Sequence, residues 1–157
     1  MKADNGVERP RRATFGSAGY DFHAPHDFDL KPGEWTDVDT GVCFDGTETV
    51  LCPICEMAFG GGIRYVESKC DTVWQWVMLL FPRSGLGTKY GMRFANTVGV
   101  IDMSYRGTIR ARMTADVPVT IHKGERFMQG VIVPFGVFRG EVEPTEERRG
   151  GHGSTGL

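Results

Sequence analysis

Short apolar runs alternate with turn-forming residues along most of the chain. Ile109, Ala111 and Met113 are separated by polar residues, which is the period of a strand with one buried face. No stretch keeps the helical period long enough for an ordinary amphipathic helix, and Ser84–Lys89 suits about one helical turn. Many short strands joined by Gly and Pro turns predict an all-β sandwich, barrel or jelly roll. The other runs of strand length are Trp35–Phe44, Val73–Phe81 with Met92–Ala95 beside it, Val117–Ile121 and Gln129–Phe135.

The length and the composition along the chain suggest one domain with two arms. The 157 residues are enough for a single core. Residues 1–12 are polar and basic, and we expect them to form a loosely held arm. Residues 13–140 are expected to form the β domain, with an excursion at residues 45–71. Residues 141–157 cannot bury themselves, so this C-terminal arm is either disordered or ordered by what it folds over.

The charge balance excludes several kinds of partner. Lys and Arg number 18 against 20 Asp and Glu, a formal net charge of −2. We therefore expect no direct binding of nucleic acid and no membrane-surface patch. The longest apolar run, Trp74–Phe81, is far shorter than a membrane span. Because no apolar targeting segment follows Met1, we expect a cytoplasmic location.

Spacing excludes several familiar catalytic templates. The glycines of Gly85–Gly91 have neither the P-loop spacing nor the G-x-G-x-x-G pattern, and no serine lies in a G-x-S-x-G elbow. A zinc nucleobase deaminase needs H-x-E and P-C-x-x-C. No histidine here has a Glu two residues later, and Pro53 lies inside the Cys52–Cys55 pair. These chemistries are therefore not expected.

Five separated segments are dense in small, polar or charged residues: Ala13–Ala24, Pro82–Gly91, Asn96–Gly107, Gly124–Gln129 and Arg148–Gly156. In order and spacing they resemble the five motifs of the trimeric dUTP diphosphatases, the dUTPase family. The resemblance lapses only near residues 45–71. It implies a jelly-roll β fold, a homotrimer with shared sites, and Mg²⁺-assisted hydrolysis of dUTP to dUMP and pyrophosphate. That reaction limits uracil in DNA and supplies dUMP for dTTP synthesis.

The third segment carries the candidate catalytic acid. Asp102 follows an apolar strand end, where a carboxylate can orient and deprotonate a water that is polarised elsewhere. From the residues alone, a plain hairpin-turn Asp is the alternative. The resemblance implies that Asp102 activates the water that attacks the α-phosphorus in line. It also implies that Tyr105 packs under the deoxyribose, where a 2′-hydroxyl does not fit, and that the hairpin with Asn96 and Val100 reads the uracil edge.

The second and fourth segments carry candidate phosphate ligands. Arg83, Ser84 and Gly85 offer a cation, a hydroxyl and a flexible N–H in a row, which suits phosphate oxygens. The resemblance assigns them to the phosphates and assigns Gln129 to the phosphate and water region. A buried strand glutamine is the alternative for Gln129.

Asp21 in the first segment is the candidate metal-linked residue. By resemblance it is linked to Mg²⁺ through water or to motif arginines, and a structural ion pair with Arg126 or another arginine is the alternative. Because the phosphates supply most of the metal ligands, no dedicated protein cage is expected.

The last segment departs from the family pattern. His152 stands where the family has a Phe that stacks on uracil, and the segment is compacted so that Arg148 or Arg149 serves the γ-phosphate, with Arg148 favoured. An imidazole has a smaller π-face and can be charged, so we expect weaker closure and a pH dependence between about 6 and 7. The other phosphate-binding positions implied for this closing arm are Gly153, Ser154 and Thr155.

The excursion at residues 45–71 does not fit the family pattern. Cys52, Cys55, Cys70 and Cys43 can together offer four thiolates to a structural Zn²⁺. A reversible disulfide and an unliganded surface excursion are the alternatives, and Cys43 also suits a buried strand. The excursion is also a candidate contact for a protein partner.

Two other functions are compatible with the same scaffold. A dCTP deaminase-type relative needs a Glu base in the third segment, where this chain has Asp102 and Met103. A regulatory protein-binding module would use the excursion at residues 45–71. The five segments favour dUTP hydrolysis over both.

Overall fold

The computed structural model describes residues 1–4, 6–44, 72–102, 104–138 and 140–141. The excursion at 45–71 and the C-terminal arm from residue 142 lie outside these residues. The elements in chain order are β1 (Lys2–Ala3), β2 (Gly19–His23), β3 (Phe28–Leu30), β4 (Thr36–Cys43), β5 (Thr72–Pro82), α2 (Ser84–Tyr90), β6 (Arg93–Phe94), β7 (Gly99–Ile101), β8 (Thr108–Thr114), β9 (Val119–Ile121) and β10 (Arg126–Phe138).

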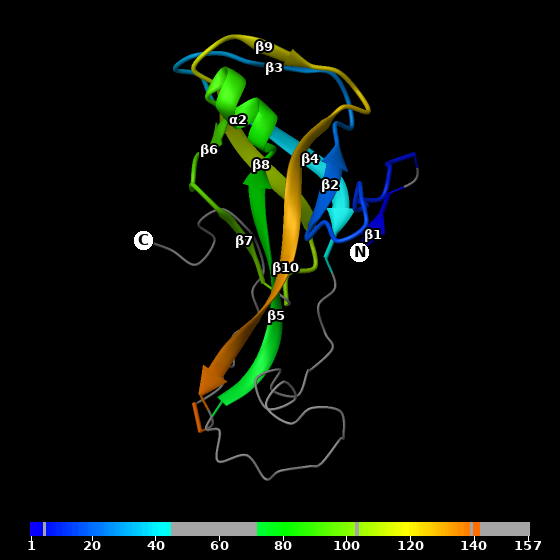
Figure 1. Cartoon of the computed structure of the whole chain (residues 1–157), viewed down its shortest axis with the longest axis vertical. Helices are drawn as coiled ribbons and strands as arrows, with labels where there is room; N and C mark the ends of the chain where they lie inside the picture. Colours follow the sequence, from blue (N-terminus) through cyan, green and yellow to red (C-terminus); the bar gives the residue numbers. More distant parts are fainter. Residues whose placement is uncertain (5, 45–71, 103, 139, 142–157) are drawn as a thin grey trace.

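The strands form antiparallel sheets, which confirms the predicted all-β class (Figure 1). One sheet has the order β1-β4-β8-β6 and another has the order β2-β10-β5-β7, while β3 and β9 pair separately. The run Met92–Ala95 supplies β6, which pairs with β8 rather than with β5. Strands β2 and β3 were not expected as strands, because each is short and carries polar residues.

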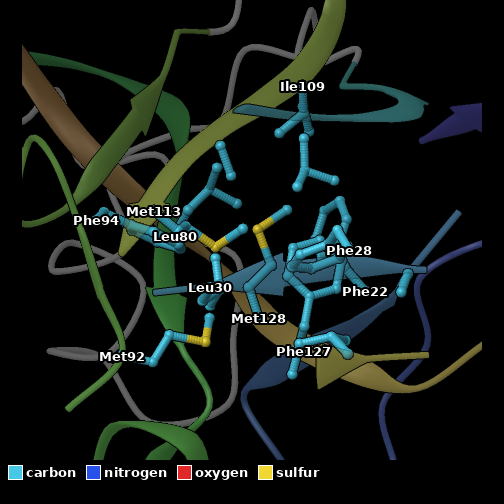
Figure 2. Packing of buried hydrophobic residues seen from close by; sticks show 14 of the residues in the cluster. Phe22, Phe28, Leu30, Leu80, Met92, Phe94, Ile109, Met113, Phe127 and Met128 are labelled. Atoms are coloured by element: carbon cyan, nitrogen blue, oxygen red, sulfur yellow. The ribbon is translucent and has the colours of Figure 1, made fainter. Parts of the chain in front are cut away.

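The two four-stranded sheets bury their facing side chains in one apolar core (Figure 2). Ile109 and Met113 of β8 are fully buried and Ala111 is 5% exposed, so the predicted alternation is confirmed. Phe28 and Phe127 meet edge to face with ring centroids 5.5 Å apart. Burial of each large apolar side chain contributes about 1.5–3 kcal/mol, which makes this core the main support for the cleft described below. The other labelled members of the core are Phe22, Leu30, Leu80, Met92, Phe94 and Met128.

Strands β5 and β10 continue beyond the rest of their sheet as a two-stranded ribbon (Figure 1). Strand β2 pairs with β10 only as far as Val131, and β7 pairs with β5 only at Met78–Leu80. Pro134 lies opposite Trp76, beyond the part of β10 that pairs with β2. A proline that lacks an N–H is accommodated there because this edge of β10 has no partner strand among the described residues.

Helix α2 directly follows β5 and presents the second segment. Arg83 keeps an extended backbone, with φ −65° and ψ 137°, and the helix begins at the next residue. It ends at Gly91, whose φ of 63° is the left-handed conformation that glycine adopts without strain. The helix spans Ser84–Tyr90, longer than the single turn expected from the sequence.

The N-terminal residues differ from the expected loose arm. β1 pairs with β4, and Met1, Ala3 and Val7 pack against the core. Arg11 forms an isolated bridge with Asp21 of β2. The polar composition of residues 1–12 gave no indication of these pairings, because they are made by backbone groups and do not require apolar side chains.

Candidate active site

A cleft of about 1060 Å³ opens between the N-terminal segment, β2, α2 and the start of β10. Five cationic side chains and two carboxylates line it, so with His23 neutral the cleft carries a net charge of +3 while the whole chain carries −2. A concave surface of one charge sign concentrates ligands of the opposite sign. The charged residues that line the cleft are Arg11, Arg12, Arg83, Lys89, Arg126, Asp21 and Glu125.

The carboxylate of Asp21 holds two arginines in this cleft. Nε of Arg83 lies 3.2 Å from Oδ1, and Nη1 of Arg126 donates to Oδ2 at 3.1 Å. The Asp21 side chain is only 8% exposed, and its strand is bridged to Arg11 by two backbone hydrogen bonds. The structure thus contains the ion pair with Arg126 that the sequence left as the alternative for Asp21, and it adds Arg83.

Arg83 is fixed at one end and unengaged at the other. Its backbone N–H donates to the carbonyl of Phe127 at 3.2 Å, and its Nε is held by Asp21. Within the described residues its two terminal guanidinium nitrogens have no recorded partner. Their four N–H bonds therefore remain for an anion such as a phosphate. Ser84 and Gly85 line the same cleft, so the structure brings together all three predicted phosphate ligands of the second segment.

Two further cations line the cleft without an ion pair among the described residues. Nζ of Lys89 lies 4.9 Å from the ring centroid of Tyr90. The hydrogen bond and the charge interaction with Tyr90 raise the pKa of Lys89 above its ordinary value, which already leaves a lysine charged at neutral pH. Arg12 is exposed at the rim. Both are positioned to attract an anionic ligand.

His23 contributes a buried polar atom to the cleft wall. Its side chain is 8% exposed, and its Nδ1 has no hydrogen-bond partner among the described residues. Oε2 of Glu8 is the nearby carboxylate, 3.6 Å from that nitrogen. Glu8 also accepts a bond from Arg11 at 2.9 Å, so the N-terminal segment and β2 meet at this wall.

Gln129 lies opposite Asp21 in the β10–β2 pairing but does not line the cleft. It is half-buried, and its amide covers Gly19 so closely that a Cβ at that glycine would lie 2.6 Å from Oε1. These contacts fit the strand glutamine that the sequence left open. A phosphate role for Gln129 stays a prediction.

Asp102 and Tyr105 lie at one turn between β7 and β8. The backbone N–H of Tyr105 donates to the carbonyl of Asp102 at 3.1 Å, and the phenol Oη of Tyr105 donates to the carbonyl of Thr108 at 2.9 Å. Asp102 and Tyr105 are both half-buried. The structure therefore brings these two predicted residues together.

Asn96 and Val100 belong to the same connection but lie on its exposed side. Asn96 is exposed and Val100 is 53% exposed. Thr97 between them has φ 63°, a conformation that is costly for a β-branched residue. Backbone strain of this kind is found at functional turns, and the role of this hairpin in reading uracil stays a prediction.

The two groups of predicted residues lie far apart within one chain. Ile101 pairs with Met78, so Asp102 lies near Val77 in the middle of β5, whereas Arg83 follows the C-terminal end of that strand. Arg83 lies six positions after Val77 along an extended strand, which is about 20 Å at ~3.3 Å per residue. Figure 1 shows α2 at the end of β5 that is remote from the β7–β8 connection. The turn with Asp102 also has no residue in the cleft lining.

Several predicted residues lie outside the described part of the chain. They include three of the four candidate zinc ligands, and Cys43, which is described, has a half-buried free thiol at the end of β4. The zinc site, the disulfide and the protein contact at 45–71 thus stay predictions. The predicted residues outside the described part are Cys52, Cys55, Cys70, Arg148, Arg149, His152, Gly153, Ser154 and Thr155.

Neither a metal cage nor a membrane span is found in the part of the chain that the structure describes. No three His, Cys, Asp or Glu side chains there are grouped to hold a metal ion. No described helix has the length and apolar character needed to cross a membrane.

Comparison with known proteins decides the family. The dUTPase family model matches residues 66–156. The deoxyuridine 5'-triphosphate nucleotidohydrolase of Cutibacterium acnes is 34% identical over 155 residues, which cover 94% of this chain and 85% of that protein. The chain belongs to the dUTPase family. The resemblance found in the five segments is thereby confirmed.

Solved dUTPase structures share the fold. The dUTPase of Streptococcus mutans superposes with a TM-score of 0.61 at 27% identity, covering 88% of this chain and 98% of that one. A variant dUTPase from phage phi11 of S. aureus, studied for its coordination of a structural Mg(II) ion, gives a TM-score of 0.58 at 20% identity. That match covers 92% of this chain and 93% of the phage protein and supports the fold alone.

Sequence reasoning missed much of the cleft wall. Arg12 and Lys89 come from separate segments, and neither has a pattern of its own that indicates an anion site. Arg126 was considered only as an ion-pair partner. The one available signal was that Arg12, Lys89 and Arg126 each lie within or beside a segment that matches a dUTPase motif.

Proposed function

We propose that this chain hydrolyses dUTP to dUMP and pyrophosphate by in-line attack of water on the α-phosphorus. The proposal rests on membership of the dUTPase family together with one observation: the cleft of this chain bears a net positive charge, and a buried carboxylate fixes Arg83 in it. A dCTP deaminase is not favoured, since no Glu base stands beside Asp102.

Arg83 and its neighbours bind the phosphates. Asp21 restrains the Nε end of the Arg83 guanidinium, and the terminal nitrogens donate to phosphate oxygens. Ser84 and Gly85 add a hydroxyl and a backbone N–H at the same wall. Because Asp21 fixes the arginine before substrate arrives, less conformational entropy is lost on binding.

Asp102 orients and deprotonates the attacking water. The proton of the water passes to the carboxylate, the hydroxide oxygen bonds to the α-phosphorus, and the bond from that phosphorus to the bridging oxygen of the leaving pyrophosphate breaks. Tyr105, in the same turn, packs under the deoxyribose, and the Asn96–Val100 hairpin reads the uracil edge.

The site is completed by other copies of the chain in a homotrimer. The separation of about 20 Å between Asp102 and Arg83 along extended strands supports this, because a nucleotide cannot contact both residues of one chain in productive geometry. One copy then supplies Asp102 and Tyr105, and a neighbour supplies the cleft with Arg83.

A bound Mg²⁺ would take most of its ligands from the triphosphate. Both oxygens of Asp21 already face arginines, and the described residues offer no cluster of metal ligands, so a phosphate-bound ion fits the donors present. When bound, Mg²⁺ neutralises charge on the pyrophosphate as it leaves.

A structural zinc at the four cysteines is tested by metal analysis of protein purified without added zinc.

The C-terminal arm closes over the bound nucleotide, and Arg148, Ser154 and Thr155 reach the terminal phosphates. We predict that His152→Phe lowers the KM for dUTP by roughly fivefold, since phenyl stacks on a base better than imidazole does. The change should also remove the pH dependence of KM between about 6 and 7, because phenyl cannot be protonated. Steady-state kinetics at several pH values measure both effects, with His26→Phe as the control on an exposed loop. An unchanged KM and an unchanged pH profile would contradict stacking at this position.

Pyrophosphate release from dUTP, dCTP, dTTP and UTP tests the proposed function as a whole. We expect turnover of dUTP and poor turnover of the other three. Hydrogen-bond readout of uracil rejects cytosine, whose exocyclic amine exchanges an acceptor for a donor. Comparable rates on dCTP and dUTP would contradict the proposal.

A further inference from the structure

The ring of Tyr105 is folded back across its own turn. Its backbone N–H bonds to Asp102, whereas its Oη donates to the carbonyl of Thr108, three residues later, at 2.9 Å. The side chain therefore spans the backbone between positions 105 and 108. Two hydrogen bonds at opposite ends of the residue fix both the place and the tilt of the ring.

Gly107 lies against the hydroxyl end of this ring. A Cβ built on Gly107 would lie 2.6 Å from Oη, 2.8 Å from Cζ and 3.2 Å from Cε2 of Tyr105. Carbon atoms pack at about 3.5–4.0 Å, so an added methyl group would displace the ring by roughly 1 Å. All three of the atoms nearest to the built Cβ belong to Tyr105.

The backbone of Gly107 does not itself require glycine. Gly107 is absent from the glycines with positive φ, so an alanine there meets no left-handed strain. The demand for glycine at this position comes from the Tyr105 ring. A substitution therefore acts on the ring rather than on the course of the chain.

We infer that Gly107 is a positioning residue for sugar selection, which seats the Tyr105 ring at the height where it accepts a deoxyribose and excludes a 2′-hydroxyl. This rests on the proposed function, in which Tyr105 packs under the sugar. A ring displaced by about 1 Å loses its fit to deoxyribose, and a misplacement of that size can cost as much as 10²-fold in rate. The loss falls on dUTP more than on UTP, which the seated ring already excludes.

The test is Gly107→Ala, read as the ratio of kcat/KM for dUTP to that for UTP. We expect the ratio to fall at least about tenfold. Gly87→Ala is the matched control, because it adds the same methyl group where the nearest atom, the Met92 carbonyl oxygen, is 3.7 Å away. Its ratio should stay within about twofold of wild type. A Gly107→Ala protein with an unchanged ratio would overturn the inference while leaving dUTP hydrolysis intact.

A double-mutant cycle with Tyr105→Phe separates ring seating from general damage. Phenylalanine lacks the Oη that makes the closest approach and lacks the bond to Thr108, so its ring can tilt away from an added methyl group. In this background Gly107→Ala should change the ratio by less than about threefold. If Gly107→Ala alone does not fold, the double variant should restore folding. Equal damage in both backgrounds, by activity ratio or by melting temperature, would contradict the inference.

Discussion

Asp102→Asn should lower kcat for dUTP by about 10²–10⁴-fold, equivalent to roughly 3–5 kcal/mol of barrier. The amide keeps the shape of the carboxylate but cannot accept the proton of the attacking water. Because the substitution keeps the backbone hydrogen bond from Tyr105 to Asp102 that holds this turn, we expect KM and the melting temperature to change little. Steady-state kinetics together with thermal unfolding separate the two contributions.

The matched control for Asp102→Asn is Asp37→Asn, on the exposed side of β4. Asp37 makes a long ion pair, 3.9 Å from Nη1 of Arg112, and lies on the other four-stranded sheet. The Asp37→Asn substitution should leave kcat for dUTP unchanged. An Asp102→Asn enzyme within tenfold of wild type in turnover would remove Asp102 from the mechanism.

Asp21→Asn should lower both the free energy of unfolding and the affinity of the cleft for the phosphates. The substitution removes the negative charge that Arg83 and Arg126 share and turns an NH₂ group toward one of the two cations. The two arginine side chains are 35% and 43% exposed, so solvent screening reduces the cost to about 2 kcal/mol of unfolding free energy. Loss of the fixed Arg83 should also lower kcat/KM for dUTP by about 10²-fold.

Denaturant unfolding and kinetics measure these two effects of Asp21→Asn. Asp37→Asn again serves as the control, since an exposed ion pair contributes at most about 1 kcal/mol. Wild-type stability together with wild-type kcat/KM in Asp21→Asn would show that the paired arginines do not organise the cleft.

The sequence predicted best where the burial of side chains alone determines the structure. The alternation at Ile109, Ala111 and Met113 predicted β8 because one face of that strand lies in the core. The short strand β3 was not predicted, because three residues are too few to show an alternation of apolar and polar positions. β1 also escaped, because its pairing uses backbone groups that any sequence possesses.

The candidate site was predictable in its residue types but not in its arrangement. The order of the five segments made Arg83, Asp102 and Tyr105 candidates, and the structure brings the last two together at one turn. Asp21 contacts both Arg83 and Arg126, which are distant from it in the sequence. A short sequence motif therefore cannot predict this contact. The distance between Asp102 and Arg83 likewise depends on which residues of β7 pair with which residues of β5. The alternation of apolar and polar residues does not determine that pairing.

Subunit complementation tests the division of the active site between copies of the chain most directly. Asp102→Asn and Arg83→Ala chains, each inactive alone, are unfolded together and refolded as a mixture. If one copy supplies Asp102 and a neighbour supplies Arg83, random trimers should recover about one quarter of wild-type activity, because that fraction of sites receives both intact residues. A mixture of Asp102→Asn with the Asp102→Asn/Arg83→Ala double variant is the control and should remain inactive. No recovery in the first mixture, or full activity in a wild-type protein that stays monomeric, would contradict the account.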